Sequence, residues 1–132
     1  MIALDTNVVV RLLTADDPAQ VEAARRALRS QPLFLSKTVL LETEWVLRYS
    51  YELGREEIAD ALSKLVRYAR MEVEDLAAVS EALSWHAQGM DLADALHLAS
   101  SGQADRLATF DRKLAATAAA LHCMPRVQLL EP

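Results

Sequence analysis

Apolar and polar residues follow two different spacings along this chain, and the spacings predict strands and helices in alternation. Short apolar runs bounded by polar or turn-forming residues predict strands, whereas apolar residues three and four positions apart predict amphipathic helices. The predicted strands are MIAL, PLFLS, RLATF and RVQLL, with MEVED as a minor one. The predicted helices cover residues 6–13, 18–30, 38–53, 55–70, 76–88, 91–103 and 111–122.

This alternation predicts the fold class. Strands separated by helices pair in parallel, with helices on both faces of the sheet. The chain has no internal repeat, linker or low-complexity tract, so we expect a single α/β domain over residues 1–132. At the start of the second predicted helix, either Asp16 or Asp17 can serve as the N-cap before Pro18.

Two aspartates directly follow predicted strands. Asp5 comes after IAL, and Asp111 comes after LATF. Ligands of open α/β sheets bind beyond the carboxyl ends of the strands, so we expect these two carboxylates at one edge of the sheet, where they share a ligand. Asp5 also stands between two largely apolar runs, where a buried carboxylate needs a partner or a bound cation.

Composition narrows the function classes. A chain of 132 residues that is 52% hydrophobic and 25% charged is typical of one soluble globular domain. Its apolar runs are far shorter than the roughly 20 residues that span a bilayer, and no signal sequence precedes them, so we expect a cytoplasmic protein without membrane association. One cysteine and three scattered histidines exclude an internal disulfide and a cysteine/histidine zinc site. Any metal is therefore held by oxygen.

The net charge of −5 argues against a protein that binds nucleic acid over a broad basic surface. That objection weakens if bound cations neutralise some of the carboxylates. The 14 Lys and Arg residues also leave room for a local basic patch around a cleft.

The segment TVLLETEWVLRYS contains two glutamates in different helical phases. At about 100° per residue, Glu42 falls on the most apolar face of the predicted helix. Its neighbours on that face are Val39, Trp45, Val46 and Tyr49. Glu44 instead precedes Arg48 by four residues, the favourable order for a solvated ion pair. A glutamate in an apolar stripe needs a metal or a buried cation, so Glu42 is the candidate site residue.

The segment GMDLADALHLAS places Asp91 and Asp94 three residues apart at a helix start. Aspartates at the N-cap and in the first turn accept backbone N–H hydrogen bonds and complement the helix dipole. Capping alone therefore explains this pair, and it explains Asp5 or Asp111 when each is taken alone. The conjunction of carboxylates at two strand ends, in an apolar helix face and at a helix start favours a shared cation.

Four segments together resemble the signature segments of the PIN-domain family, and in particular the small VapC-type toxins of type II toxin–antitoxin pairs. They are MIALDTNVVVRLL, VLLETEWVLR, GMDLADALHLAS and LATFDRKL, in this order within residues 1–114. The resemblance implies a three-layer α/β/α sandwich around a short, mainly parallel central sheet. It also implies a pocket that binds Mg²⁺ or Mn²⁺ and cleaves RNA phosphodiesters.

Position by position, the resemblance implies a set of site residues. The catalytic acids fall on Asp5, Glu42, Asp94 and Asp111, with Glu44 as an alternative to Glu42. The implied metal ligands are Asp5, Asp94 and Asp111, with Asp91 as an auxiliary acid, and the residues that support the pocket are Thr6, Asn7 and Thr109. Carboxylates gathered in one pocket repel one another unless a divalent cation neutralises them. Mg²⁺ prefers oxygen ligands and keeps several of its waters, which suits such a site.

An acidic pocket leaves substrate binding to nearby basic residues. Candidate RNA contacts are Arg11 and Arg112, followed by Arg48 and Lys113. The resemblance further implies a cognate antitoxin that inserts Arg or another side chain into the pocket. It also implies a homodimer, for which the apolar helix faces at residues 58–69 or 76–83 are candidate surfaces.

Two rival classes make different demands on the sequence. A phosphoaspartyl enzyme of the haloacid dehalogenase type needs a second aspartate two residues after Asp5, where this chain has Asn7. A catalytically silent PIN-like scaffold for protein binding has no reason to keep several mutually repelling carboxylates together. We therefore expect a metal-dependent endoribonuclease.

Overall fold

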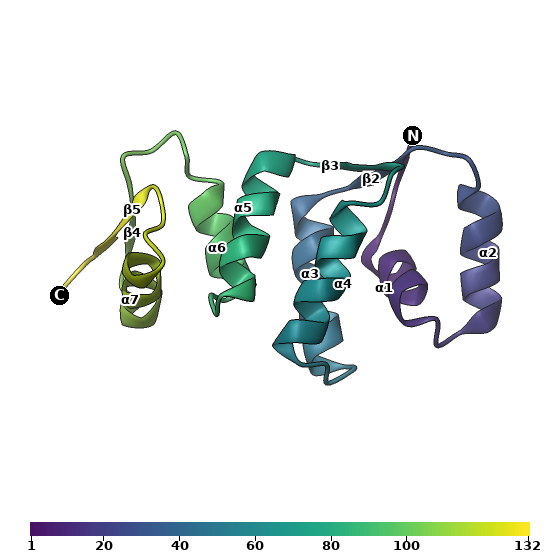
Figure 1. Ribbon diagram of the computed structural model, residues 1–132, viewed down its shortest axis with the longest axis horizontal. Coiled ribbons are helices and arrows are strands. Elements are labelled where there is room, and N and C mark those ends of the chain that lie inside the picture. Colours follow the sequence, from purple (N-terminus) through teal and green to yellow (C-terminus); the bar gives the residue numbers. More distant parts are fainter. The chain divides into compact units, whose positions relative to one another are not determined.

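Strands and helices alternate along the computed structural model, which describes residues 1–132 (Figure 1). The chain forms two compact units, residues 1–76 and 77–132. Each unit contains its own parallel sheet, of three strands in the first unit and of two strands in the second.

The first unit surrounds a sheet with the strand order β1-β2-β3. Its elements are β1 (Ile2–Ala3), α1 (Thr6–Thr14), α2 (Pro18–Leu28), β2 (Leu33–Leu35), α3 (Lys37–Tyr49), α4 (Arg55–Val66) and β3 (Met71–Val73). The central strand β2 pairs in parallel with both neighbours, with Leu33 opposite Ile2 on one side and opposite Met71 on the other. Leu33 and Leu35 are buried, as expected of a strand that is covered by helices.

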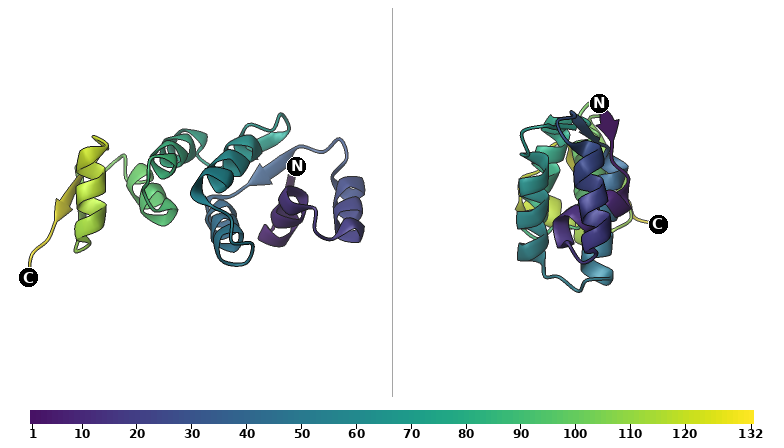
Figure 2. Two further views of the ribbon diagram at one scale, coloured as in Figure 1. Left: turned by 60° about the horizontal axis from the view of Figure 1, so that its bottom comes forward. Right: turned by 90° about the vertical axis from the view of Figure 1, so that its right-hand side faces the viewer.

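The second unit combines a helix pair with a two-stranded parallel sheet. Its elements are α5 (Leu76–Ala87), α6 (Leu92–Ala99), β4 (Arg106–Thr109), α7 (Arg112–Ala120) and β5 (Arg126–Leu129). Strand β4 pairs with β5 from Arg106 opposite Arg126 to Thr109 opposite Leu129. Helix α7 is the crossover between them and lies alongside the strand pair (Figures 1 and 2). The buried residues Leu114 and Ala118 belong to this helix.

These elements confirm the predicted α/β class and parallel pairing, and every predicted strand and helix is present. Helix α3 ends at Tyr49, earlier than predicted, because Ser50 is its C-cap and Glu52 adopts a left-handed backbone with φ of 54°. Asp17, not Asp16, caps α2 by accepting a hydrogen bond from the Gln20 N–H. That the whole chain acts as a single domain stays a prediction.

The two helix faces considered for a dimer are only partly buried within the chain, and Leu76 of the second is more than half exposed. Ile58 and Leu62 of α4 are buried, as are Val79 and Ala82 of α5. These side chains are therefore core residues and not a free surface. No helix combines the length and the apolar character needed to cross a membrane.

Candidate functional site

The first unit holds two of the predicted acids, Asp5 and Glu42, which both accept hydrogen bonds from Thr6. Asp5 follows β1 and is the N-cap of α1, where its Oδ1 accepts a hydrogen bond of 2.8 Å from the Thr6 N–H. The buried Thr6 side chain donates from Oγ1 to Glu42 Oε1, across from α1 to α3. Thr6 therefore contacts Glu42 through its hydroxyl and Asp5 through its N–H, and its role in supporting the pocket stays a prediction.

Asp5 is exposed, so the cost of burying a carboxylate does not apply to it. The flanking apolar residues Leu4 and Val9 are buried, but the chain turns into the helix at Asp5 and leaves its side chain on the surface. Because the cap uses only Oδ1, capping and ligand binding are compatible at this position.

A pocket of about 590 Å³ opens beside these acids, entirely within the first unit. Asp5, Thr6, Asn7 and Glu42 line it together with Val10, Arg11, Asp16, Val46, Ser50 and Tyr51. The predicted support residue Asn7 thus lies on the same pocket wall as Asp5. The pocket is mixed in charge, with carboxylates and a single basic side chain, Arg11, among its lining residues.

The helical phase of the glutamate doublet differs from the prediction. Glu44 is buried, with 2% of its surface exposed, and Glu42 is exposed. The buried stripe of α3 is Leu40, Thr43, Glu44 and Leu47, whereas Trp45 and Tyr49 on the other stripe are more than half exposed. The prediction of an apolar face around Glu42 was wrong because the aromatic residues there are not core residues.

The ion pair predicted for Glu44 is present but is not fully solvated. Arg48 Nε and Nη2 donate to the two carboxylate oxygens of Glu44 at 2.9 and 3.1 Å. The Glu44 side chain is 3% exposed and the Arg48 side chain 41% exposed. Glu44 therefore has a structural role, and Glu42, which faces the pocket, is the glutamate available for ligands.

The second unit holds the other predicted acids, Asp91, Asp94 and Asp111. Asp91 is the N-cap of α6 and accepts from the Asp94 N–H at 3.2 Å. Asp111 is the N-cap of α7 and accepts from the N–H groups of Lys113 and Leu114. Thr109 at the end of β4 accepts a hydrogen bond from the Asp111 N–H, which supports the turn that presents this carboxylate.

The surroundings of Asp94 in this unit change the ionisation of its carboxyl. Partial burial raises the pKa of the Asp94 carboxyl, and the negative charges of Asp91 and Asp111 raise it further. The positive charges of His97 and Lys113 oppose this effect. The negative charges of Asp91 and Asp111 thus act on Asp94, and repulsion of this kind disfavours the ionised carboxylates.

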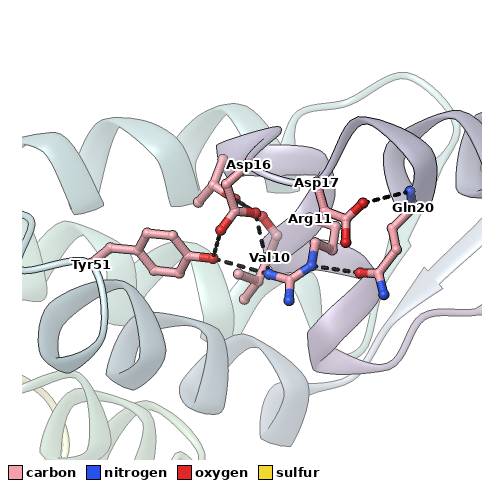
Figure 3. Close-up of polar contacts among 7 residues, drawn as sticks. Val10, Arg11, Asp16, Asp17, Gln20 and Tyr51 are labelled. Carbon is pink, nitrogen blue, oxygen red and sulfur yellow. Dashed lines mark hydrogen bonds and ion pairs between the residues drawn. The ribbon is translucent and has the colours of Figure 1, made fainter.

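Arg11 and Arg112, the first two predicted RNA contacts, have different surroundings. Arg112 is highly exposed and lies 3.8 Å from Glu131. Arg11 contacts three residues that sequence analysis missed, namely Asp16, Gln20 and Tyr51 (Figure 3). The only available signal was the DDPAQ segment after α1, because Tyr51 reaches Arg11 from a loop 40 residues later.

The donor chemistry of both acidic clusters fits a divalent cation. Carboxylate oxygens are the ligands that Mg²⁺ and Mn²⁺ prefer, and the mutual repulsion around Asp94 is what a bound cation relieves. No group of three or more His, Cys, Asp or Glu side chains has the geometry to hold a metal ion. Asp5 follows a strand of one sheet and Asp111 a strand of the other, so their sharing of one ligand stays a prediction.

Comparison with known proteins gives one match. The sequence profile of the PIN domain matches residues 2–120 and so includes all of the acids described above. No curated protein and no solved structure matches the chain.

Proposed function

The chain belongs to the PIN-domain family, and from that premise we propose that it is a Mg²⁺- or Mn²⁺-dependent endoribonuclease, the VapC-type toxin of a type II toxin–antitoxin pair. PIN domains are generally metal-dependent nucleases that act on RNA or DNA, so the class of hydrolase follows from the family. RNA as the substrate, the toxin role and a cytoplasmic location rest on the four segments that resemble VapC-type toxins.

The observation that carries the proposal is the crowding of carboxylates around Asp94. Burial and the charges of Asp91 and Asp111 all raise the pKa of Asp94. Like charges at this distance make it unfavourable for all three carboxylates to be ionised unless a cation is bound. Helix capping alone gives no reason to place them together. A cation held by oxygen ligands accounts for it.

From the resemblance to the family's signature segments, we propose Asp5, Asp94 and Asp111 as metal ligands, with Asp91 as an auxiliary acid. A divalent ion bound there supplies Lewis-acid polarisation of a phosphoryl oxygen and activation of a water nucleophile. Glu42 is oriented by the Thr6 hydroxyl, and Asp111 is held by the turn at Thr109. The protein thereby presents its carboxylates in fixed directions before a ligand binds.

Cleavage of a mixed pool of structured RNAs tests the activity. Purified wild-type protein, free of any partner, is compared with and without Mg²⁺ or Mn²⁺, with a chelator, and with the variants Asp94→Asn and Asp105→Asn. Asp94→Asn keeps the size of the side chain and removes its charge, and we expect it to lower cleavage at least about 100-fold. The exposed Asp105 of the same unit is the matched control and should retain full activity.

The result that contradicts the proposal is a folded wild-type protein that cleaves no RNA with either metal. The chain would then be better described as a silent PIN-like scaffold. Titration of Mn²⁺ into wild-type, Asp5→Asn and Asp94→Asn proteins tests the shared ion separately. A shared ion predicts that both variants lose the same binding event, whereas two independent sites would leave each variant with one.

An apolar groove of about 560 Å³ in the first unit supports the proposal that an antitoxin binds this protein. Its lining includes the apolar residues Leu4, Leu12, Leu28 and Leu65 and the basic residues Arg25, Arg29, Lys64 and Arg70. An apolar surface edged by cations suits an acidic amphipathic segment of a partner. We expect the product of a short upstream reading frame to inhibit cleavage, and Arg25→Glu with Arg29→Glu to weaken that inhibition without changing cleavage itself.

A homodimer is part of the same proposal. Light scattering of the purified toxin on a sizing column measures its mass directly, and a monomer at all accessible concentrations would contradict this part alone.

A further inference from the structure

The pocket of the first unit contains one cation among its carboxylates. Asp5, Asp16 and Glu42 line it, and Arg11 is the only Lys or Arg among its lining residues. Arg11 lies four residues after Asn7 on α1, so the two side chains share the face of the helix that forms the pocket wall. A polyanion that enters this pocket therefore has a single protein cation available to it.

The guanidinium group of Arg11 is held at three of its five N–H donors (Figure 3). Nε donates to Gln20 Oε1 at 2.6 Å, and Nη1 donates to Asp16 Oδ1 at 3.3 Å and to the Tyr51 hydroxyl at 3.0 Å. The second terminal nitrogen, Nη2, has no hydrogen-bond partner in the chain. Two N–H donors with a fixed direction are thus left for a ligand.

Tyr51 bridges Arg11 and Asp16. Its hydroxyl accepts from Arg11 and donates to Asp16 Oδ2 at 2.5 Å. That bond, together with the Arg11 charge, keeps the pKa of the exposed Asp16 carboxyl below its ordinary value, so Asp16 stays ionised as a partner of Arg11. Thr14 adds a hydrogen bond of 3.0 Å to Asp16 Oδ1.

The segments that carry these partners are themselves fixed. Tyr51 follows the end of α3, where its own N–H donates to the Val46 carbonyl and Leu53 N–H donates to the Leu47 carbonyl. Gln20 lies in the first turn of α2, and its N–H donates to Asp17. The direction of the Arg11 fork is therefore set by three elements before any ligand arrives, which lowers the entropy cost of binding.

We propose that Arg11 Nη2 binds a phosphate of the nucleic-acid substrate, with Tyr51, Asp16 and Gln20 as positioning residues. The proposal rests on the proposed nuclease function, since it places a phosphate contact in the pocket that holds Asp5 and Glu42. The remaining N–H groups of Nη2 belong to a charged guanidinium, and a charge-assisted hydrogen bond from them suits a phosphate oxygen. The contact is to the backbone and not to a base, so it is common to RNA and DNA.

Binding of labelled single-stranded RNA and DNA of one sequence tests the contact. Fluorescence anisotropy is measured with Mg²⁺ at several salt concentrations, in an Asp94→Asn background so that cleavage does not interfere. The added variants are Arg11→Gln and Tyr51→Phe. The control is Arg26→Gln, which makes the same change in charge on the exposed face of α2, outside this pocket.

We expect Arg11→Gln to weaken binding of both oligonucleotides about 3- to 10-fold and to reduce the salt slope by about 0.7, the loss of one phosphate contact to a single strand. Arg26→Gln should change neither by more than about 2-fold. In the cleavage-competent protein, Tyr51→Phe should raise KM for RNA and leave kcat unchanged, which a purely structural role of the hydroxyl would not produce.

Unchanged affinity and salt slope in Arg11→Gln would overturn the phosphate contact, as would an equal loss in Arg26→Gln. If thermal unfolding shows that Arg11→Gln does not fold, Tyr51→Phe, which removes one oxygen atom, decides the question through KM. If the wild-type protein cuts no nucleic acid but binds it through Arg11, the nuclease proposal fails and the contact stands. If it cuts RNA with no dependence on Arg11, the reverse holds.

Discussion

The two acidic clusters of this protein, Asp5 with Glu42 and Asp91 with Asp94 and Asp111, differ in the groups that surround their carboxylates. In the first unit, Thr6 donates its hydroxyl to Glu42 and its N–H to Asp5, while Arg11 supplies a positive charge in the same pocket. In the second unit, partial burial raises the pKa of the Asp94 carboxyl, and the charges of Asp91 and Asp111 raise it further. Both clusters therefore contain hydrogen-bonded carboxylates, but only the first also has an arginine in its pocket, and in the second the like charges act on Asp94.

This difference indicates a division of roles. We propose that Arg11 of the first cluster positions the substrate, whereas the carboxylates of both clusters, Asp5 among them, bind cations. Loss of a charge should therefore matter in both clusters for activity, and loss of the Thr6 hydroxyl or of Arg11 should matter in the first.

The largest expected effect separates the two glutamates of α3. Glu42→Gln removes the charge that faces the pocket, and we expect cleavage to fall by about 100-fold or more with little change in stability. The measurement is RNA cleavage together with thermal unfolding. Retention of full activity would remove Glu42 from the site and leave the first cluster with Asp5 as its only candidate ligand.

The next effect concerns the buried carboxylate of Glu44. Arg48→Met leaves that charge without its bidentate partner and should lower the free energy of unfolding by about 3 kcal/mol. Lys64→Met, which breaks the exposed pair with Asp60 at the same four-residue spacing, is the control and should cost less than about 0.5 kcal/mol.

Urea denaturation of both variants measures the difference. The double variant Glu44→Leu with Arg48→Met should recover most of the lost stability, because it no longer buries a charge. Equal stability of Arg48→Met and wild type would show that Glu44 does not depend on this pair.

A smaller effect is expected at the hydroxyl that orders the first cluster. Thr6→Val keeps the shape of the buried side chain and removes the donor to Glu42, so cleavage should fall about 10-fold. Thr6→Ser retains the hydroxyl and should keep most of the activity. If valine and serine variants cleave equally well, the hydrogen bond to Glu42 has no part in the reaction.

The smallest effect is a shift in ionisation within the second cluster. Asp111→Asn removes a like charge, so the pKa of Asp94 should fall toward its ordinary value, as followed by carboxyl NMR in the metal-free protein. Because the folded state raises this pKa, the contribution of Asp94 to stability is present at low pH and is lost as pH rises through the folded pKa. Asp105→Asn is the control and should leave the titration of Asp94 unchanged.

Local patterns predicted the elements well because each carries its own signal. Pro18 after an aspartate marked the start of α2, and Asp111 after the apolar run RLATF marked the start of α7. The positions of Asp5, Asp91 and Asp111 as N-caps were likewise readable, since a cap is a contact between residues one to three positions apart.

Residues that meet across elements were harder to predict. The phase of α3 was misjudged because Trp45 and Tyr49 resemble core residues in sequence, and only packing shows that Leu40, Thr43, Glu44 and Leu47 form the buried stripe. Tyr51 was missed because its contact with Arg11 joins residues 40 positions apart through a loop.

The sequence by itself determined the order of strands and helices, the caps that begin the helices, and the identity of the acids within the PIN-like segments. These depend on short-range hydrogen bonds and on the spacing of apolar residues. Only the tertiary structure decided that Glu42 and not Glu44 faces the pocket, and that Arg11 is clamped by Gln20, Asp16 and Tyr51. Such contacts depend on how helices pack side by side, and packing is a property of several elements at once.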